Sequence, residues 1–411
     1  MHSLLKIALR NLLRYKRRTV LTVSLIVIGL VFVLVFISVS GSFKQMIIGQ
    51  ITDSMMGHIQ IHKKGYVASI DNLPLDVNLS SKSLAKLKEV LSREKSILCY
   101  SERIKFGGML SNYSETTNIR LNGIKPEQEF QTVPLLTSRI IEGKKSLKRG
   151  EILVPILLAK GMNLKIGTPV VVVTTNKDGS VNGKTLMVAG VLENVIGPMG
   201  RDGYIHYDDA ADLLRMEQSE ASEVVLRLRD YDQLHRVEKE LAQILSQELM
   251  KNGKPVFEVH AWDKLHPFGN IAGMIDMMTF FTTLMLVAIV LISILNVMTM
   301  AVYERMKEIG TIIALGTLPG KIAQLFLVEG LSMGVVGVLA GNVISLILLA
   351  VIKHLKITFP FLRDEFILAP RVNPLDFLIA SLIVIFISTL ATLQPALKAS
   401  RLDPVKTFRQ M

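Results

Sequence analysis

Cysteine is almost absent from this chain, because Cys99 is the only one among 411 residues. No disulfide can form within the chain, so any folded domain must be held together by its core alone. Aromatic residues make up only 6%, with a single tryptophan, Trp262. The first 18 residues contain no acidic side chain, although they contain several basic ones: Lys6, Arg10, Arg14, Lys16, Arg17 and Arg18.

Nucleotide-binding and catalytic motifs are also missing. Residues 179–185 resemble a phosphate-binding loop, but three residues separate the glycines instead of four, and the stretch lies in a predicted hairpin. Residues 316–321 also have three residues between their glycines, so they do not form a phosphate-binding loop either. His58 and His62 share a face of a predicted strand without an evident third metal ligand. Serine and cysteine nucleophile motifs are absent. We therefore expect no catalytic residues, no metal site and no cofactor on this chain, and we predict that it is not an enzyme.

The composition is that of a membrane protein with a large aqueous domain. Half of the residues are hydrophobic and 20% are charged, and the mean hydropathy is +0.41. These values are compatible only if apolar and charged residues are segregated along the chain. The net charge is +12. Much of it flanks apolar segments, which favours membrane topology over nucleic-acid binding as its cause.

Long stretches without any charge locate the membrane spans. Each is long enough to cross a hydrocarbon core of about 30 Å, which requires about 20 helical residues. The first could instead belong to a cleaved signal peptide ending near Ser40, but it is longer than the core of about 7–15 residues that such peptides have. The predicted transmembrane helices are residues 19–43, 277–303, 330–352 and 377–397.

Basic residues set the predicted orientation. They cluster before the first span, between the second and third spans, and after the fourth, and such clusters favour the cytoplasmic side. The loop between the third and fourth spans is also basic, but the N-terminal cluster is the densest and decides the assignment. We predict a cytoplasmic amphipathic helix (1–18), a cytoplasmic coupling segment (304–321), a short periplasmic loop (353–373) and a cytoplasmic tail (398–411).

Residues 44–270 then form a large periplasmic domain with helical stalks. Alternating apolar residues predict two βαβ units, one from His58 to Phe106 and the other from Val224 to His260. The two units would pair into a membrane-proximal α/β subdomain, and residues of about 107–220 would form a mostly β insert. Its clearest strands, 170–174 and 185–191, are joined by a turn at 177–179. The predicted fold class is therefore an α+β membrane protein with four transmembrane helices and a periplasmic α/β domain.

Methionine is concentrated in the stalks and at the outer ends of the first two spans. Its flexible side chain adapts to irregular apolar shapes, such as an acyl chain. Packing between the helices themselves is the simpler explanation of the same residues. The candidate substrate-contact residues are Met46, Ile47, Met55, Met274, Met277 and Met278.

The segment between the second and third spans is the most informative part of the cytoplasmic surface. A short helix with charges at one end and an apolar patch at the other is predicted there, followed by a Gly/Pro turn. A soluble partner would bury the patch, unless the helix lies in the lipid headgroup region. The patch comprises Ile309, Ile312, Ile313 and Leu315.

Several stretches resemble a known family. ERMKEIGTIIALGTLPGKIAQLFLVEG (304–330) and QPALKASRLDPVKTFR (394–409) are similar to the two cytoplasmic signatures of FtsX-like, or MacB-type, ABC transporter permeases. Residues 151–175 and 191–214 resemble the periplasmic core domain of that family. MMGHIQIHKKGY (55–66) resembles the start of that domain in lipoprotein-releasing (Lol) permeases. The resemblance covers essentially the whole chain.

The resemblance implies a mechanism and partners. Two permeases, identical or different, would pair in the bacterial inner membrane, and each would dock one cytoplasmic ABC ATPase, which binds the ATP and Mg. The cycle would extract lipoproteins from the membrane for a periplasmic carrier. Export of a peptide, toxin or antibiotic through an outer-membrane duct and regulation of cell-wall hydrolases are the alternatives. The implied coupling residues are Glu304, Arg305, Lys307, Glu308, Ile309, Gly310, Ala314, Leu315 and Gly316.

Overall fold

The chain folds into two compact units, which we call the helical unit (residues up to Met46 and from Gly273 onward) and the sheet unit (Ile47–Ala272). The predicted amphipathic helix 1–18 and the predicted tail 398–411 fall mostly outside the residues that can be described. The computed structural model describes residues 10, 14–193, 200–216, 220–248, 250–251, 254–265, 268–361 and 364–401.

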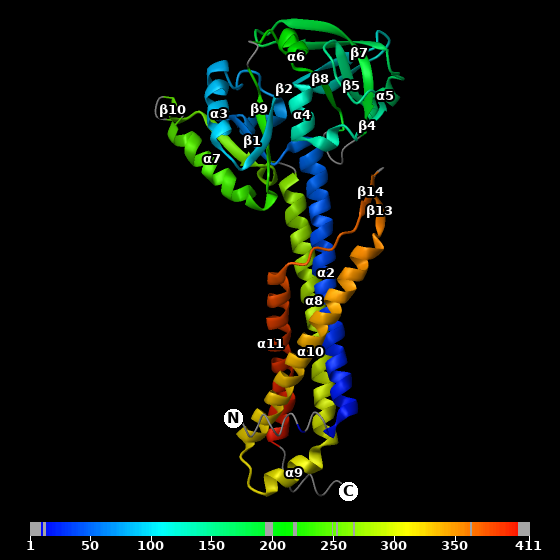
Figure 1. Ribbon diagram of the computed structural model, residues 1–411, viewed down its shortest axis with the longest axis vertical. Helices are drawn as coiled ribbons and strands as arrows, with labels where there is room; N and C mark the ends of the chain where they lie inside the picture. Colours follow the sequence, from blue (N-terminus) through cyan, green and yellow to red (C-terminus); the bar gives the residue numbers. More distant parts are fainter. Residues whose placement is uncertain are drawn as a thin grey trace. The chain divides into compact units, whose positions relative to one another are not determined.

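Four helices among the described residues are long and apolar enough to cross a membrane. Each contains one of the charge-free stretches found in the sequence and extends beyond it, because flanking polar residues continue the helix. They run along one another in the helical unit (Figure 1) and share a core that includes Ile26, Ile294 and Val384. The four helices are α2 (Lys16–Ile51), α8 (Phe268–Glu304), α10 (Pro319–Leu355) and α11 (Pro374–Ser400).

Small residues let α10 approach two of its neighbours closely. A Cβ on Gly337 would lie 2.6 Å from the Ile26 side chain of α2, and a Cβ on Gly334 would overlap Ser388 of α11. Gly341 and Gly330 repeat these two contacts one turn away, against Leu30 and Thr392. The glycine spacing of the third span therefore permits close helix approach.

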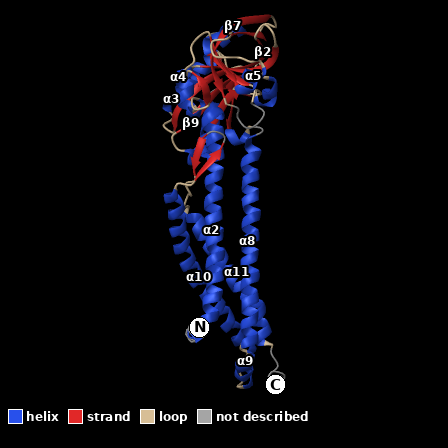
Figure 2. Cartoon of the chain, turned by 90° about the vertical axis from the view of Figure 1, so that its right-hand side faces the viewer, coloured by secondary structure: helices blue, strands red, loops and turns tan. Residues whose placement is uncertain are grey.

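Short elements connect the helices of this unit. Helix α9 (Met306–Ala314) joins α8 to α10. The segment 353–373, expected as a plain loop, contains the antiparallel hairpin β13–β14 (Thr358–Phe361 and Asp364–Ile367). Apart from this hairpin, the described strands belong to the sheet unit (Figure 2).

One half of the sheet unit is a split βαβ fold. Its strands are arranged in the order β12-β1-β9-β2, and every neighbouring pair is antiparallel. The two predicted βαβ units therefore interleave, because β9 of the second unit lies between the two strands of the first. The elements are β1 (Ile59–Lys63), α3 (Ser81–Arg93), β2 (Ile97–Ser111), β9 (Glu223–Leu228), α7 (Leu234–Glu248) and β12 (Phe257–Ala261).

The other half continues the same sheet through strand β2. The first part of β2 pairs with β9, and its second part pairs with β3 and β6, so the predicted insert begins inside a continuous strand. The β6–β7 hairpin has its turn at the predicted place, where Gly179 has a φ of +82°. This half contains β3 (Thr116–Ile124), α4 (Pro126–Thr132), β4 (Ile140–Gly143), β5 (Glu151–Pro155), α5 (Ile156–Gly161), β6 (Pro169–Thr175), β7 (Val181–Leu192), β8 (Asp202–His206) and α6 (Tyr207–Leu214).

Short helical turns and a small hairpin complete the sheet unit. They are η1 (Thr52–Met56), η2 (Val67–Asn72), η3 (Pro134–Leu136), η4 (Tyr231–Gln233), η5 (Trp262–Lys264), β10 (Met250–Lys251) and β11 (Lys254–Pro255).

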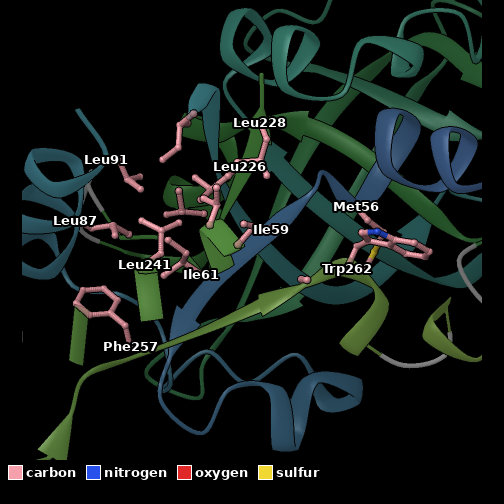
Figure 3. Close-up of a cluster of buried hydrophobic side chains, with 14 of the residues drawn as sticks. Met56, Ile59, Ile61, Leu87, Leu91, Leu226, Leu228, Leu241, Phe257 and Trp262 are labelled. Carbon is pink, nitrogen blue, oxygen red and sulfur yellow. The ribbon is translucent and has the colours of Figure 1, made fainter. Parts of the chain in front are cut away.

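The core of the split βαβ half also contains the end of α2 and residues shortly before α8. Figure 3 shows Ile61, Leu87 and Leu241 in this core, which brings together the sheet and the apolar faces of α3 and α7. The same cluster includes Ile51 at the end of α2 and Trp262, which is 1% exposed, shortly before α8. Burial of a large apolar side chain contributes roughly 1.5–3 kcal/mol, so both connections are firmly anchored within the sheet unit.

Buried charges join the two halves of the sheet unit. The Arg103 guanidinium of β2 contacts Glu129 of α4 at 2.5 Å and Glu223 of β9 at 3.1 Å. Glu223 also lies 3.4 Å from both Lys105 and His62. Burial alone would raise the pKa of Glu223, but Lys105, His62 and Arg103 together hold it well below its usual range. The carboxylate therefore stays ionised and ties β1, β2 and β9 together.

Asp202 at the start of β8 provides a test of this buried charge arrangement. Burial raises its pKa from 3.8 to about 6, although Lys105, Arg120 and Arg139 act in the opposite direction. Because the folded state binds the proton more tightly, the stabilising effect of that proton is complete below about pH 4 and is lost as the pH rises through about 6. We predict that Asp202→Asn stabilises the sheet unit above pH 6 by up to about 3 kcal/mol and has little effect at pH 4.

Urea unfolding of the full chain in detergent, followed by the fluorescence of the single tryptophan, measures this difference at pH 4 and pH 8. The exposed Asp178→Asn is the matched control and should leave stability unchanged at both values. An equal effect of Asp202→Asn at pH 4 and pH 8 would contradict the prediction.

Candidate functional site

Helix α9 lies at the end of the helical unit where α8 ends and α10 begins (Figure 1). Arg305 separates α8 from α9 and has a non-helical backbone conformation. The helix ends at Ala314, and Gly316 follows it with a φ of +90°, which is readily accessible only to glycine. Pro319 then occupies the first turn of α10, where its missing N–H is not needed. The sequence therefore fixes a short helix between two sharp turns.

The side chain of Arg305 connects α9 to two other segments. Its Nη1 lies 3.2 Å from the Oε1 of Glu329 in α10, and its Nε lies 3.4 Å from the Oε2 of Glu308. Its guanidinium stacks over the ring of Tyr15 at 4.4 Å from the ring centroid. Arg305 is 9% exposed and Glu329 is fully buried. Such a buried charge must be compensated, and here two carboxylates and an aromatic ring compensate it.

Glu308 is fixed from the other side by the N-terminal segment. The hydroxyl of Tyr15 donates a hydrogen bond of 2.6 Å to the Oε1 of Glu308. This bond, together with the charges of Arg305 and Arg14, holds the pKa of Glu308 below its usual range. The carboxylate therefore remains ionised and connects Tyr15 to α9.

Three apolar side chains of α9 and its C-terminal turn are exposed. Leu315 is 82% exposed, Leu318 is 65% exposed and Ile312 is 41% exposed. Apolar side chains exposed together in this way are typical of a surface that another molecule covers. We call these three residues the α9 apolar surface.

The structure divides the predicted coupling residues into two groups. The expectation that Ile309 is a surface anchor is wrong, because Ile309 is 5% exposed and packs into the core of the helical unit. Arg305 and Gly310 are also buried, so Arg305 positions α9 and does not present its charge to solvent. The exposed members of the predicted set are Glu304, Lys307, Glu308, Ala314, Leu315 and Gly316.

The predicted substrate-contact residues also fall into two groups, one buried or partly buried and the other exposed. The proposal that Met55 contacts substrate is wrong for this structure, because it is 4% exposed and belongs to the core of the sheet unit. Ile47 packs partly against the same core. Met46 is half-buried in α2. By contrast, the three methionines of α8 are exposed side by side at helical spacing: Met274, Met277 and Met278.

Sequence reasoning missed Tyr15 and Glu329 as members of the site. Glu329 had a detectable signal, because it is an acidic residue directly before an apolar stretch and such residues normally have a partner. Tyr15 had none, because a tyrosine near a basic cluster at a membrane boundary is common. Only the fold brings Tyr15 to α9.

The alternative sites considered in the sequence have other roles. Residues 179–185 lie in the β6–β7 hairpin and not before a helix. His62 contacts Glu223, and His58 lies 3.7 Å from Asp53. Among the described residues, no group of three or more His, Cys, Asp or Glu side chains could hold a metal ion.

Comparison with known proteins identifies the family. The model of the MacB-like periplasmic core domain matches residues 19–244, and the model of the FtsX-like permease C-terminal matches residues 280–404. The chain is 24% identical to the lipoprotein-releasing system transmembrane protein LolC of Neisseria meningitidis, over 95% of this chain and 94% of that protein. It is also 24% identical to the ABC transporter permease YknZ of Bacillus subtilis, over 98% of each.

Among solved structures, the periplasmic region of MacB from Actinobacillus actinomycetemcomitans aligns with a TM-score of 0.37 and 16% identity, covering 54% of this chain and 94% of that one. The first family model alone covers more than half of the chain, and the second contains α9 and most of the last three long helices. The chain therefore belongs to the family of ABC transporter permeases that combine a MacB-like periplasmic core domain with an FtsX-like C-terminal permease domain.

Proposed function

We propose that this chain couples ATP hydrolysis by a separate ABC ATPase to the extraction of lipoproteins from the inner membrane. Members of the family are non-catalytic membrane components of ABC transporters, and the four apolar helices make this chain an inner-membrane protein. The observation that carries the proposal is the α9 apolar surface, held in place by Arg305. The ATPase subunit would cover this surface.

The proposed orientation places α9 in the cytoplasm and the sheet unit in the periplasm. It rests on the basic clusters before α2, around α9 and after α11. Single cysteines at the exposed positions Lys307 and Asp178, in a Cys99→Ser background, should react from opposite sides of the membrane in intact cells. A membrane-impermeant thiol reagent is expected to label position 178 and not position 307. Equal labelling of the two positions would refute the orientation.

A mechanical relay between the ATPase and the sheet unit would follow from the helix connections. Polar contacts join α2 to α8 within the helical unit, with Ser40 2.6 Å from Thr279 and Lys44 2.6 Å from Asp276. The chain at the end of α2 and the chain before α8 are both anchored in the sheet unit core. An ATP-loaded partner would need to bind one conformation of the permease more tightly than the other. Movement of this helix pair would then be transmitted to the sheet unit.

Lipoproteins are the proposed substrate because the LolC relative spans nearly the whole chain. The exposed methionines of α8 supply a flexible apolar surface suited to acyl chains. Two permeases, as a homodimer or a heterodimer, would present two such surfaces and bind two ATPase subunits. A periplasmic carrier would then accept the substrate. Efflux through an outer-membrane duct is the second candidate, favoured by a 29% identity to MacB of Neisseria gonorrhoeae over 150 residues. Regulation of cell-wall hydrolases is the third alternative.

Substitution of Leu315 tests the coupling surface. Leu315→Asp places a charge on an exposed apolar side chain, and at the centre of an interface such a change costs about 2 kcal/mol or more, or roughly 30-fold in affinity. We predict a loss of ATPase binding to the purified permease and of transport, with the permease still folded. Glu308→Lys should have the same effect, but it also breaks the contact with Tyr15.

Leu157→Asp is the matched control, because Leu157 is an exposed leucine on a short helix of the sheet unit. It should bind the ATPase like the unchanged chain. Unaltered ATPase affinity of the Leu315→Asp permease would exclude this docking site.

Photocrosslinking tests the substrate. A photoreactive amino acid at the exposed Met277 should capture a lipid-modified protein in cells. The same amino acid at Leu390, an exposed position on α11, is the matched control and should capture much less. Crosslinked species that carry no lipid modification at Met277 would favour the efflux alternative.

A further inference from the structure

A cavity of about 430 Å³ lies within the helical unit, between α9, the start of α10 and the N-terminal segment. Its volume falls in the range of about 300–1,000 Å³ that small-molecule sites occupy. Ile309, Ile322 and Phe326 line it and are each at most 5% exposed, while Ile312 and Leu325 are more open to solvent. These five side chains form an apolar wall of the cavity.

Positive charge borders the same cavity. Arg10, Arg14 and Arg305 contribute to its lining together with Glu308. Arg305 is compensated by Glu308 and Glu329. Arg10 and Arg14 are exposed, and neither forms an ion pair with any carboxylate in the described ranges. The guanidinium carbon of Arg14 lies 5.8 Å from the centroid of the Tyr15 ring, and the charge of Arg14 helps to lower the pKa of Glu308. Among the described residues, the cavity thus combines apolar side chains with two guanidinium groups that form no ion pair.

The cavity is also placed where lipid headgroups occur. Ile322, Leu325 and Phe326 lie in the first turns of α10, which is one of the four candidate membrane spans. The beginning of such a span lies at the boundary between hydrocarbon and water. A ligand that is anionic at one end and apolar along the rest matches both the charges and the position.

We propose that this cavity binds one anionic phospholipid, with its phosphate between Arg10 and Arg14 and an acyl chain along Ile312, Leu325 and Phe326. The bound lipid would pack against α9 beside Arg305 and so contribute to the position of the α9 apolar surface. This site is distinct from the exposed methionines of α8, which lie toward the other end of that helix. It does not depend on the ATPase or on the transported substrate.

Lipid binding to the purified full chain tests the proposal. Phosphatidylglycerol and phosphatidylethanolamine with identical acyl chains are added separately in detergent, and the lipid retained by the folded chain is measured by native mass spectrometry. The unchanged chain should retain one phosphatidylglycerol in preference to phosphatidylethanolamine. Arg10→Gln with Arg14→Gln should weaken phosphatidylglycerol binding roughly 30-fold, since each basic group near a membrane surface contributes about a factor of five.

Two further variants separate this site from general electrostatic attraction. Lys398→Gln with Arg401→Gln removes two exposed charges near the end of α11 that do not line the cavity, and it should leave binding unchanged. Ile312→Trp keeps every charge but fills the cavity, and it should weaken binding at least tenfold. Equal retention of the two lipids would overturn the proposal. An equal loss of phosphatidylglycerol binding in the variant with Lys398→Gln and Arg401→Gln would also overturn it. Unaltered binding by Ile312→Trp would overturn it as well. None of these outcomes bears on ATPase docking, because no ATPase is present in the measurement.

Discussion

The buried charge of Arg305 is the constraint on which the candidate site depends. A guanidinium that leaves water must be surrounded by compensating groups, and removal of one partner of such a buried pair typically costs about 3–5 kcal/mol. Glu329 supplies one partner from inside α10, Glu308 supplies another from α9, and the Tyr15 ring covers the guanidinium. These contacts hold three segments together that are distant in the sequence. The position of α9 is therefore set by electrostatics as well as by its two flanking turns.

This arrangement decides which side of α9 is available to a partner. Ile309 points into the helical core, whereas Leu315, Leu318 and Ile312 remain exposed. Apolar side chains in such numbers at the end of a bundle are costly to leave in water, so a protein or lipid surface that covers them gains the free energy of their burial. Family membership supplies the kind of partner, because these permeases work with an ABC ATPase.

The sheet unit is also held together by a buried charge, together with a continuous sheet. Without disulfides, it relies on a continuous sheet in which β2 belongs to both halves, and on the ionised Glu223 buried between them. The end of α2 and the residues before α8 are built into the core of the split βαβ half through Ile51 and Trp262. Each connecting segment is therefore part of a packed core.

The sequence by itself determined the number of spans, the two βαβ units, the short helix between the second and third spans, and the family. These features are local, because charge-free length, alternation of apolar residues and turn residues such as Gly316 act over a few neighbours. Only the tertiary structure decided which side chains of α9 are buried, that Met55 is a core residue, and that Tyr15 reaches Glu308. Such contacts depend on the rotation and register of packed helices, and helical periodicity alone does not specify which face meets which neighbour.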